Sequence, residues 1–232
     1  MNNMPTRPKA VVSWSSGKDS AYALYEAQRA GDFEIVGAVT TVSTSFGRVS
    51  MHGVREDVLD RQMAELSMPC RKVPIPWPCS NEIYERAMGA AVRDLQDDGV
   101  QHIIFGDLFL ADLRAYREEK LSTVGMHAVF PLWARDTSSL AREMISSGIR
   151  ATLVCIHPKK LDHSFAGRLY DESFLGDLPA DIDPCGENGE FHTVVTAGPF
   201  FARSIPTMVG EVVEREGFVY ADVKLTPASP GM

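Results

Sequence analysis

Short apolar segments and segments with helical spacing alternate along the first 134 residues of the chain. Apolar, β-branched stretches predict strands, and these lie at 11–12, 33–41, 71–75, 102–107 and 128–133. Apolar residues at helical spacing predict helices, and these lie at about 19–30, at 54–66, between Ser80 and Gly99, and at about 111–123. The alternation predicts an α/β fold with a doubly wound, five-stranded parallel sheet in the strand order 3-2-1-4-5.

The pattern changes after residue 134. A helix is expected at about 138–147 and a strand at 151–156, followed by a mixed segment at 161–178 and an irregular one at 181–190. Three short strand patterns follow, at 191–195, 208–213 and 218–225. We therefore expect a first domain over residues 1–134 and a smaller C-terminal α+β subdomain over residues 135–232.

The turn after the first strand, Ser-Ser-Gly-Lys-Asp-Ser at 15–20, has the composition of an anion-binding loop. It leads directly into a helix, whose N-terminal N–H groups stabilise a phosphate. Gly17 lets the backbone approach the ligand and Lys18 adds a cation. Further hydrogen-bond donors are the hydroxyls of Ser15, Ser16 and Ser20. We expect a polyphosphate ligand, and the alternative is an ordinary strand-turn-helix capped by Ser or Asp.

The loop differs from a Walker loop at two positions. Val12 stands where that loop has its first glycine, and Asp19 stands where it has Ser or Thr. An aspartate beside the phosphates indicates that the residues of this loop have roles different from those in a Walker loop.

A second polar concentration lies at 183–193, Asp-Pro-Cys-Gly-Glu-Asn-Gly-Glu-Phe-His-Thr. Glu187 and Asn188 can orient a substrate or ammonia. Glu190 can ligate a metal or act as a base, and His192 can transfer a proton. The alternative is an Asx/Gly turn with a solvated acidic rim.

Asp107 follows the fourth expected strand directly after Gly106. In open parallel sheets ligands bind where the winding reverses, which here is between strands one and four. We therefore expect Asp107 to face the same crevice as the loop at 15–20, and to hold Mg2+ on the nucleotide phosphates. The alternative is a loop or cap residue.

Composition and charge narrow the function classes. The chain of 232 residues is 44% hydrophobic and 23% charged, with a net charge of −8 that argues against bulk nucleic-acid binding. No apolar run of membrane-spanning length occurs and the segment 1–9 has no apolar signal core, so we expect a cytoplasmic protein. The cysteines form no CxxC pair, which disfavours a zinc or redox site; they are Cys70, Cys79, Cys155 and Cys185.

Taken together, these motifs resemble the diphthine–ammonia ligase family of PP-loop ATP pyrophosphatases across most of the chain. The loop resembles the PP-loop Ser-Gly-Gly-X-Asp-Ser, with Ser16 in place of the first glycine. The residues that carry the resemblance are Ser-Ser-Gly-Lys-Asp-Ser (15–20), His52-Gly53-Val54-Arg55, Gly106-Asp107 with Arg114 and Glu118, Phe130-Pro131-Leu132-Trp133, Gly167-Arg168, Gly-Glu-Asn-Gly-Glu-Phe-His-Thr (186–193) and Gly198-Pro199-Phe200.

The resemblance implies the N-type ATP pyrophosphatase fold and a specific reaction. ATP activates a carboxylate as an acyl-adenylate with release of pyrophosphate, and ammonia then forms the amide. The implied cofactors are ATP as substrate and Mg2+, with Asp19 and Asp107 as metal ligands. The implied acceptor is a modified histidine on a translation elongation factor, or a related carboxylate. Free ammonia is the expected nitrogen source, and we also allow for a homodimer.

Roles for the individual residues follow from this resemblance. The expected catalytic residues are Lys18, Asp107, Glu187, Asn188, Glu190 and His192. The expected nucleotide contacts are residues 15–20, His52, Arg55 and Gly106, and the expected substrate contacts are Arg114, Glu118, Gly186 and Thr193. Two alternatives stay open: His52 and Arg55 as part of a helix start, and Arg114 with Glu118 as an i,i+4 ion pair.

Two other functions fit the same loop. One is a tRNA-modifying enzyme, which the acidic charge and the missing CxxC disfavour. The other is a protein that binds ATP or AMP without turnover, which the dense polar segment at 183–193 disfavours.

Overall fold

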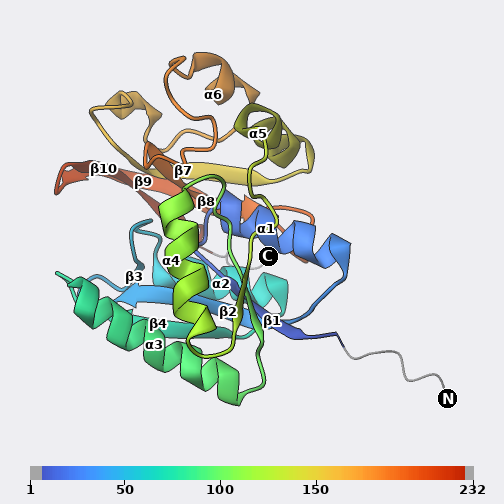
Figure 1. Cartoon of the computed structure of the whole chain (residues 1–232). Coiled ribbons are helices and arrows are strands. Elements are labelled where there is room, and N and C mark those ends of the chain that lie inside the picture. Colours follow the sequence, from blue (N-terminus) through green and yellow to red (C-terminus); the bar gives the residue numbers. More distant parts are fainter. Residues whose placement is uncertain (1–6, 228–232) are drawn as a thin grey trace, which may run out of the picture.

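The computed structural model describes residues 7–227 and has an α/β architecture (Figure 1). Its first sheet contains five parallel strands: β1 (Lys9–Ser13), β2 (Glu34–Ser43), β4 (Cys70–Ile75), β5 (His102–Ile104) and β6 (His127–Val129). The parallel pairs are β4 with β2, β2 with β1, β1 with β5, and β5 with β6. Within this sheet Val11 of β1 lies between Gly37 and Ile103. The expected α/β class is confirmed.

The sheet is mixed and not purely parallel, because a short strand that we did not expect joins it. Strand β3 (Arg48–Val49) pairs antiparallel with Val42 and Ser43 at the end of β2. The chain reverses between β2 and β3 through residues 44–47, where Gly47 has a φ of 59°. Among the described residues the sheet thus has six strands, where the sequence predicted five.

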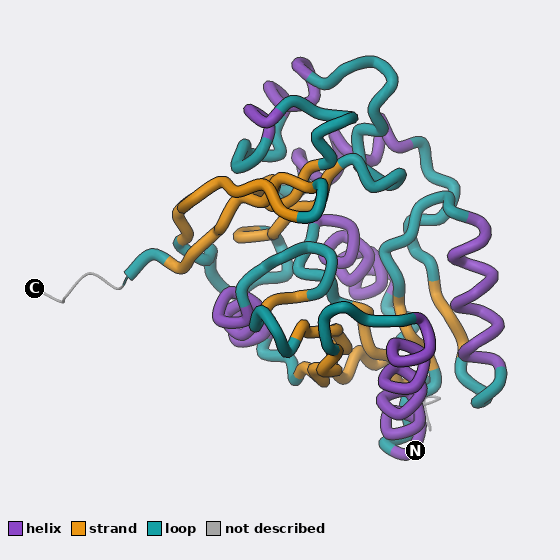
Figure 2. Tube along the Cα trace, turned by 90° about the vertical axis from the view of Figure 1, so that its left-hand side faces the viewer, coloured by secondary structure: helices purple, strands orange, loops and turns teal. Residues whose placement is uncertain are grey.

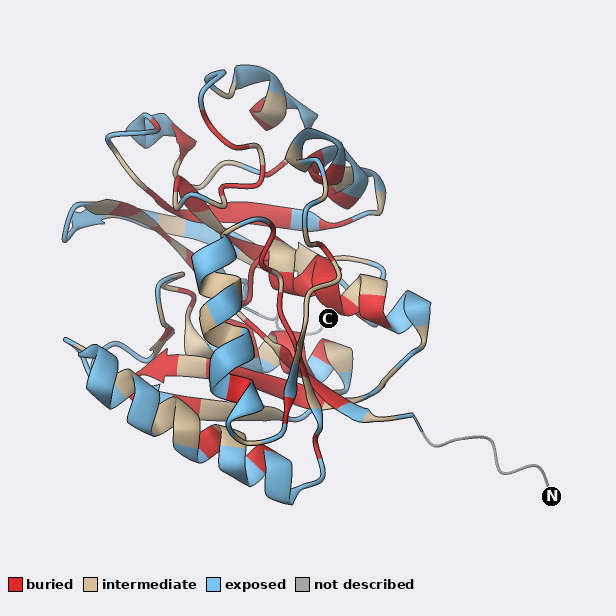
Figure 3. Ribbon diagram, viewed as in Figure 1, coloured by how far each residue is buried: buried red, intermediate tan, exposed pale blue. Residues whose placement is uncertain are grey.

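Side chains alternate between the two faces of this sheet. Val11, Val39 and Ile103 pack in a cluster with α3 (Asn81–Asp97) and α4 (Ala111–Ser122). Their neighbours, including Val12 and Ile104, join a larger cluster on the opposite face, which contains α1 (Lys18–Ala30) and α2 (Glu56–Leu66). Figure 3 shows the buried residues along the strands and α1, with exposed residues on the outer sides of α3 and α4. The central strands β1 and β5 thus bury residues on both faces of the sheet.

The second sheet is antiparallel and has the order β8-β7-β10-β9. Its strands are β7 (Arg150–Ile156), β8 (Phe191–Ala197), β9 (Thr207–Arg215) and β10 (Phe218–Leu225). The helices of this part are α5 (Thr137–Ser146), the short 3-10 helix η1 (His163–Phe165) and α6 (Glu172–Asp177). In the view turned by 90° the strands form two groups, with helices around them (Figure 2).

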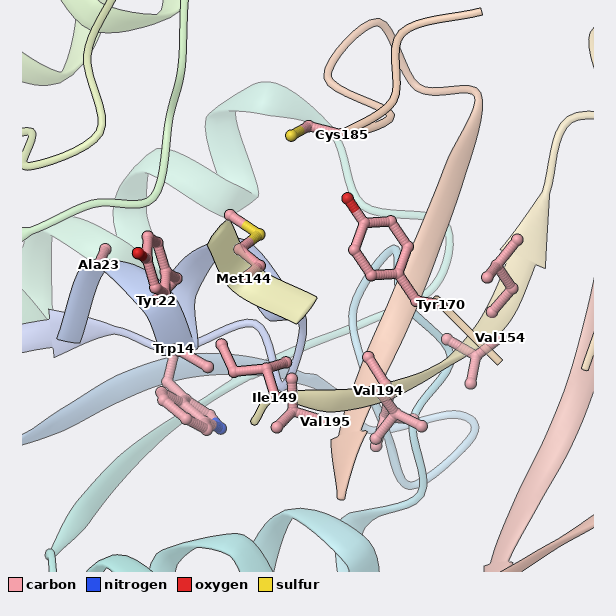
Figure 4. Close-up of a cluster of buried hydrophobic side chains, with 14 of the residues drawn as sticks. Trp14, Tyr22, Ala23, Met144, Ile149, Val154, Tyr170, Cys185, Val194 and Val195 are labelled. Carbon is pink, nitrogen blue, oxygen red and sulfur yellow. The ribbon is translucent and has the colours of Figure 1, made fainter. Parts of the chain in front are cut away.

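Helix α1 lies between the two sheets and its residues are buried along most of its length. Trp14 and Tyr22 pack in one cluster with Met144, Ile149 and Val194 from the C-terminal part (Figure 4). The hydrophobic core is therefore continuous across residue 134. The ends of the two expected domains, residues 1–6 and 228–232, lie outside the described residues. Over residues 7–227 no helix has both the length and the apolar character needed to cross a membrane.

Candidate active site

The turn between β1 and α1 has the geometry of an anion-binding loop. Gly17 immediately precedes α1, so the first N–H groups of the helix point out of its end. The Ser20 hydroxyl donates to the Gly17 carbonyl at 3.0 Å and lies 3.1 Å from the Ser15 hydroxyl. Ser16 adopts the left-handed conformation with φ of 69°, at the position where the PP-loop pattern has glycine. The loop is thus compact and held by its own hydroxyls.

Two glycines allow other segments to approach this loop. A Cβ on Gly17 would lie 2.9 Å from the His52 ring and 3.1 Å from the Thr193 carbonyl oxygen. A Cβ on Gly106 would lie 2.7 Å from the Asp19 carbonyl carbon and 2.8 Å from the Ser20 nitrogen. The chain after β5 therefore touches the backbone at the start of α1, and this contact brings Asp107 to the loop.

The loop also meets the polar segment at 183–193, which is far away in sequence. The Lys18 backbone N–H donates to the Thr193 hydroxyl at 3.1 Å, and the Val195 N–H donates to the Ser16 carbonyl at 2.9 Å. The Lys18 ammonium bonds to the Cys185 carbonyl oxygen and to both oxygens of Asp19, at 2.9 and 3.0 Å. The two concentrations of polar residues expected from the sequence thus lie in direct contact.

The Lys18 side chain is enclosed, with an exposed fraction of 1%. Its ammonium lies 5.3 Å from the ring centre of Tyr170 and 5.2 Å from that of Phe191. Burial lowers the pKa of Lys18, but the nearby Asp19 and Cys185 more than offset this and raise it. Lys18 is therefore a buried cation beneath the loop.

A cavity of about 640 Å3 opens above the loop, a size typical of small-molecule sites. The expected site residues that line it are Ser15, Asp19, Ser20, His52, Gly106, Asp107, Gly186, Glu187 and His192. The cavity continues between α3 and α4, where Tyr84, Tyr116 and Arg117 line it.

The remaining expected residues do not line this cavity. Ser16, Gly17, Lys18 and Thr193 form the layer beneath it. Asn188 is exposed, and its side-chain amide donates to Glu190 at 3.1 Å. Glu190 is 2% exposed and also lies 3.8 Å from the Lys160 ammonium.

Three expected residues form ion pairs outside the cavity lining. Arg55 binds both oxygens of Asp222 at 2.7 Å, which ties the start of α2 to β10. Arg114 bonds to Glu118 at 2.8 Å, as in the i,i+4 alternative. The Arg114 guanidinium also lies 4.7 Å from the Trp133 ring centre.

Three of the carboxylates expected from the sequence line the cavity, namely Asp19, Asp107 and Glu187. Burial raises the pKa of Glu187 to about 7, although the Leu108 N–H that donates to it at 2.8 Å acts in the opposite direction. Asp19 and Asp107 add repulsion that also raises the pKa of Glu187. Burial raises the pKa of Asp19 as well, and Lys18 opposes that shift. Asp107 is ion-paired with Arg117 at 2.9 Å.

Two imidazoles lie beside the loop with their ring centres 4.4 Å apart. One nitrogen of His52 is 3.3 Å from the Thr193 carbonyl oxygen. Burial, followed by the neighbouring His192, moves the pKa of His52 well below its usual value. Burial and then Lys18 lower the pKa of His192 to about 4. Both rings are therefore neutral at pH 7.

Within residues 7–227 no three His, Cys, Asp or Glu side chains are grouped closely enough to hold a metal ion alone. The four cysteines are free. Burial raises the pKa of the Cys185 thiol to about 12, so it is not a thiolate nucleophile at neutral pH.

Arg117 and Gln62 are among the polar residues of this site that sequence reasoning missed. Arg117 carries no signal in sequence, because its partner Asp107 becomes a neighbour only when α4 folds back. Gln62 did carry a signal. It lies four residues after Val58 and four before Leu66, on the apolar side of its helix, where a polar residue needs a partner.

Comparisons with known proteins find similar sequences of one kind. A family model described as the diphthamide synthase C-terminal domain matches residues 136–224. A Homo sapiens protein named diphthine–ammonia ligase is 27% identical over 90% of this chain and 86% of its own length. A Bos taurus protein of the same name is 26% identical with the same coverage. A Danio rerio one is 32% identical over 49% of this chain and 47% of its own length. These matches confirm the resemblance to the diphthine–ammonia ligase family.

Proposed function

We propose that this protein is an ATP-dependent ligase that joins ammonia to a carboxylate, as the names of its relatives describe for them. The observation that supports this most is the single cavity lined by both the loop at 15–20 and the segment at 186–192. One segment can hold a polyphosphate and the other an acceptor within the same cavity, as group transfer requires. In this proposal residues 1–134 chiefly bind nucleotide and residues 135–232 the acceptor.

The first step is adenylation. A carboxylate oxygen of the acceptor attacks the α-phosphorus of ATP, the bond to the β-phosphate oxygen breaks, and pyrophosphate leaves. The N-terminus of α1, with the Ser15 and Ser20 hydroxyls, stabilises the departing charge. Lys18 adds positive charge from beneath the loop, and a direct phosphate contact requires its side chain to rotate away from Cys185.

Asp19 and Asp107 are the residues that would hold Mg2+. Magnesium commonly uses one or two carboxylates together with substrate phosphates and water, which agrees with the lack of a complete ligand set in the described protein residues. When bound, the ion would neutralise charge on the phosphates.

The second step is attack of ammonia on the acyl carbon, with AMP as the leaving group. Glu187, with a pKa of about 7, is the base that takes up a proton from the attacking nitrogen at neutral pH. Neutral His192 lines the same cavity and can transfer the proton onward. The acceptor that we propose is a modified histidine on a translation elongation factor, or a related carboxylate.

The test is product analysis by mass spectrometry, with ATP, Mg2+, ammonium and a panel of carboxylates that includes the elongation factor. We expect AMP, pyrophosphate and an amide, and the amide should require all four components. Release of ADP, or binding of ATP without any cleavage across the panel, would contradict the proposal.

A further inference from the structure

The buried side chain of Gln62 on α2 holds the anion-binding loop from behind. Gln62 has no exposed surface and lies among the apolar residues of its helix, including Val58, Leu59 and Met63. A buried primary amide destabilises a protein unless it is hydrogen-bonded. The partners of Gln62 therefore show what it does.

Three hydrogen bonds fix the orientation of this amide. The Trp14 indole N–H donates to its oxygen at 3.0 Å. Its nitrogen donates to the Ser16 carbonyl at 3.1 Å and to the Val195 carbonyl at 2.8 Å. Because an indole can only donate and a carbonyl can only accept, the amide cannot be turned around in this pocket. Gln62 thereby connects α2, the loop and β8.

The hydrogen bond from Gln62 to Ser16 acts on the residue whose backbone conformation is the least favourable in the loop. Ser16 has a φ of 69°, a conformation that residues other than glycine rarely adopt. Its own hydroxyl is buried without a hydrogen-bond partner and does not hold this conformation. The support comes from its carbonyl, which accepts from Gln62 and from the Val195 N–H at 2.9 Å.

The direction of that carbonyl decides which group faces the cavity. In a planar trans peptide the C=O and the following N–H point in opposite directions. With the Ser16 carbonyl turned toward α2 and β8, the Gly17 N–H turns toward Ser15, whose hydroxyl lies 3.4 Å away and lines the cavity. A reversed peptide would present the carbonyl oxygen to an anion and repel it.

We propose that Gln62 is a positioning residue that keeps the Ser16–Gly17 peptide turned so that its N–H, and not its carbonyl, points to Ser15 and the side of the loop where the polyphosphate would bind. The inference rests on the proposed function only in taking the ligand to be a polyphosphate.

The test combines Gln62→Met with Ser16→Gly. Methionine keeps the size of the side chain but removes its hydrogen bonds, and we expect the Kd for pyrophosphate with Mg2+, measured by calorimetry, to rise on the order of tenfold. Adding Ser16→Gly should restore the affinity, because glycine takes the left-handed conformation without support. Leu59→Val, on the same buried face but without a hydrogen-bonding group, is the matched control and should leave the Kd unchanged.

Wild-type affinity in Gln62→Met would overturn the inference, and so would an equal loss in Leu59→Val or a loss that Ser16→Gly does not restore. If Gln62→Met does not fold, Gln62→Glu removes the same two donors and keeps the acceptor for Trp14. The NMR signal of the Gly17 amide gives a second readout without any ligand. We expect it to shift in Gln62→Met and to return in the double variant. If the wild type bound no pyrophosphate, the proposed function would fail, while this amide signal would still decide the role of Gln62.

Discussion

Replacing Gly106 with alanine tests whether the contact between β5 and α1 assembles the site. The added Cβ would lie 2.7 Å from the Asp19 carbonyl carbon and 2.8 Å from both the Asp19 oxygen and the Ser20 nitrogen. These are backbone atoms at the start of a buried helix, so no side chain can turn aside. To reach even 3.0 Å the two segments must separate by at least 0.3 Å.

The expected cost follows from that displacement. Overpacking of this kind destabilises by about 1–3 kcal/mol, which for a chain of this length lowers the Tm by about 2–12 °C. The separation also moves Asp107 away from Asp19. Because positioning errors near 1 Å reduce rates about 100-fold, a displacement of 0.3 Å is expected to slow AMP formation at least about fourfold.

Calorimetry and the AMP assay measure these two effects, with Gly176→Ala as the matched control. Gly176 lies in α6 with no atom within 4 Å of the added Cβ, so that alanine should leave the Tm unchanged or slightly higher. If Gly106→Ala kept both the wild-type Tm and the wild-type rate, the contact would not determine the geometry of the site.

Three further predictions concern the groups that line the cavity. Glu187→Gln should spare ATP binding and remove the amide product. The folded pKa of Glu187, about 7, is above the unfolded value of about 4.5, so its ionisation reduces stability as the pH rises from 4.5 to 7. Glu187→Gln should therefore have a higher Tm than the wild type at pH 8. An equal Tm in the two proteins would contradict the assigned burial. The pKa of His192 is about 4 when folded and about 6.5 when unfolded, so the unfolded state binds the proton first as the pH falls. His192→Gln should therefore show a smaller loss of Tm between pH 6.5 and pH 4 than the wild type, and an unchanged slope would be evidence against a buried neutral ring. Asp107→Ala should abolish ATP cleavage in the product assay, and normal turnover would show that the reacting phosphates lie elsewhere.

The elements that the sequence predicted well are those fixed by local patterns. The start of the helix expected between Ser80 and Gly99 is confirmed, since α3 begins at Asn81 and the Ser80 side chain accepts from the Ile83 N–H at 3.3 Å. The helix expected at about 19–30 spans Lys18–Ala30, with Gly31 in the left-handed conformation at its end. In these elements the residues that determine the boundary are a few positions apart, so a sequence pattern contains the information.

The features that the sequence did not predict depend on partners far along the chain. The two-residue strand β3 is too short to have a pattern, and Arg48 is held by Asp222 of β10 at 2.8 Å. Arg55 was expected at the nucleotide and binds the same Asp222. The position of Lys18 in a glycine- and serine-rich loop suggested phosphate contact, but only tertiary structure shows its ammonium beneath the loop, against Cys185.

The loop at 15–20 is a short segment with the conformation of an anion site, yet several of its restraints come from the C-terminal part of the chain. Thr193 accepts from the Lys18 N–H, and Val195 donates to Ser16. Strand β8 directly follows the polar segment at 183–190. A movement of that segment would therefore also move Cys185 and β8, which contact the loop peptides that would bind phosphate. If the proposed function holds, the acceptor and nucleotide sides of the cavity are connected through α1 and β8, and occupancy of one should alter the affinity of the other.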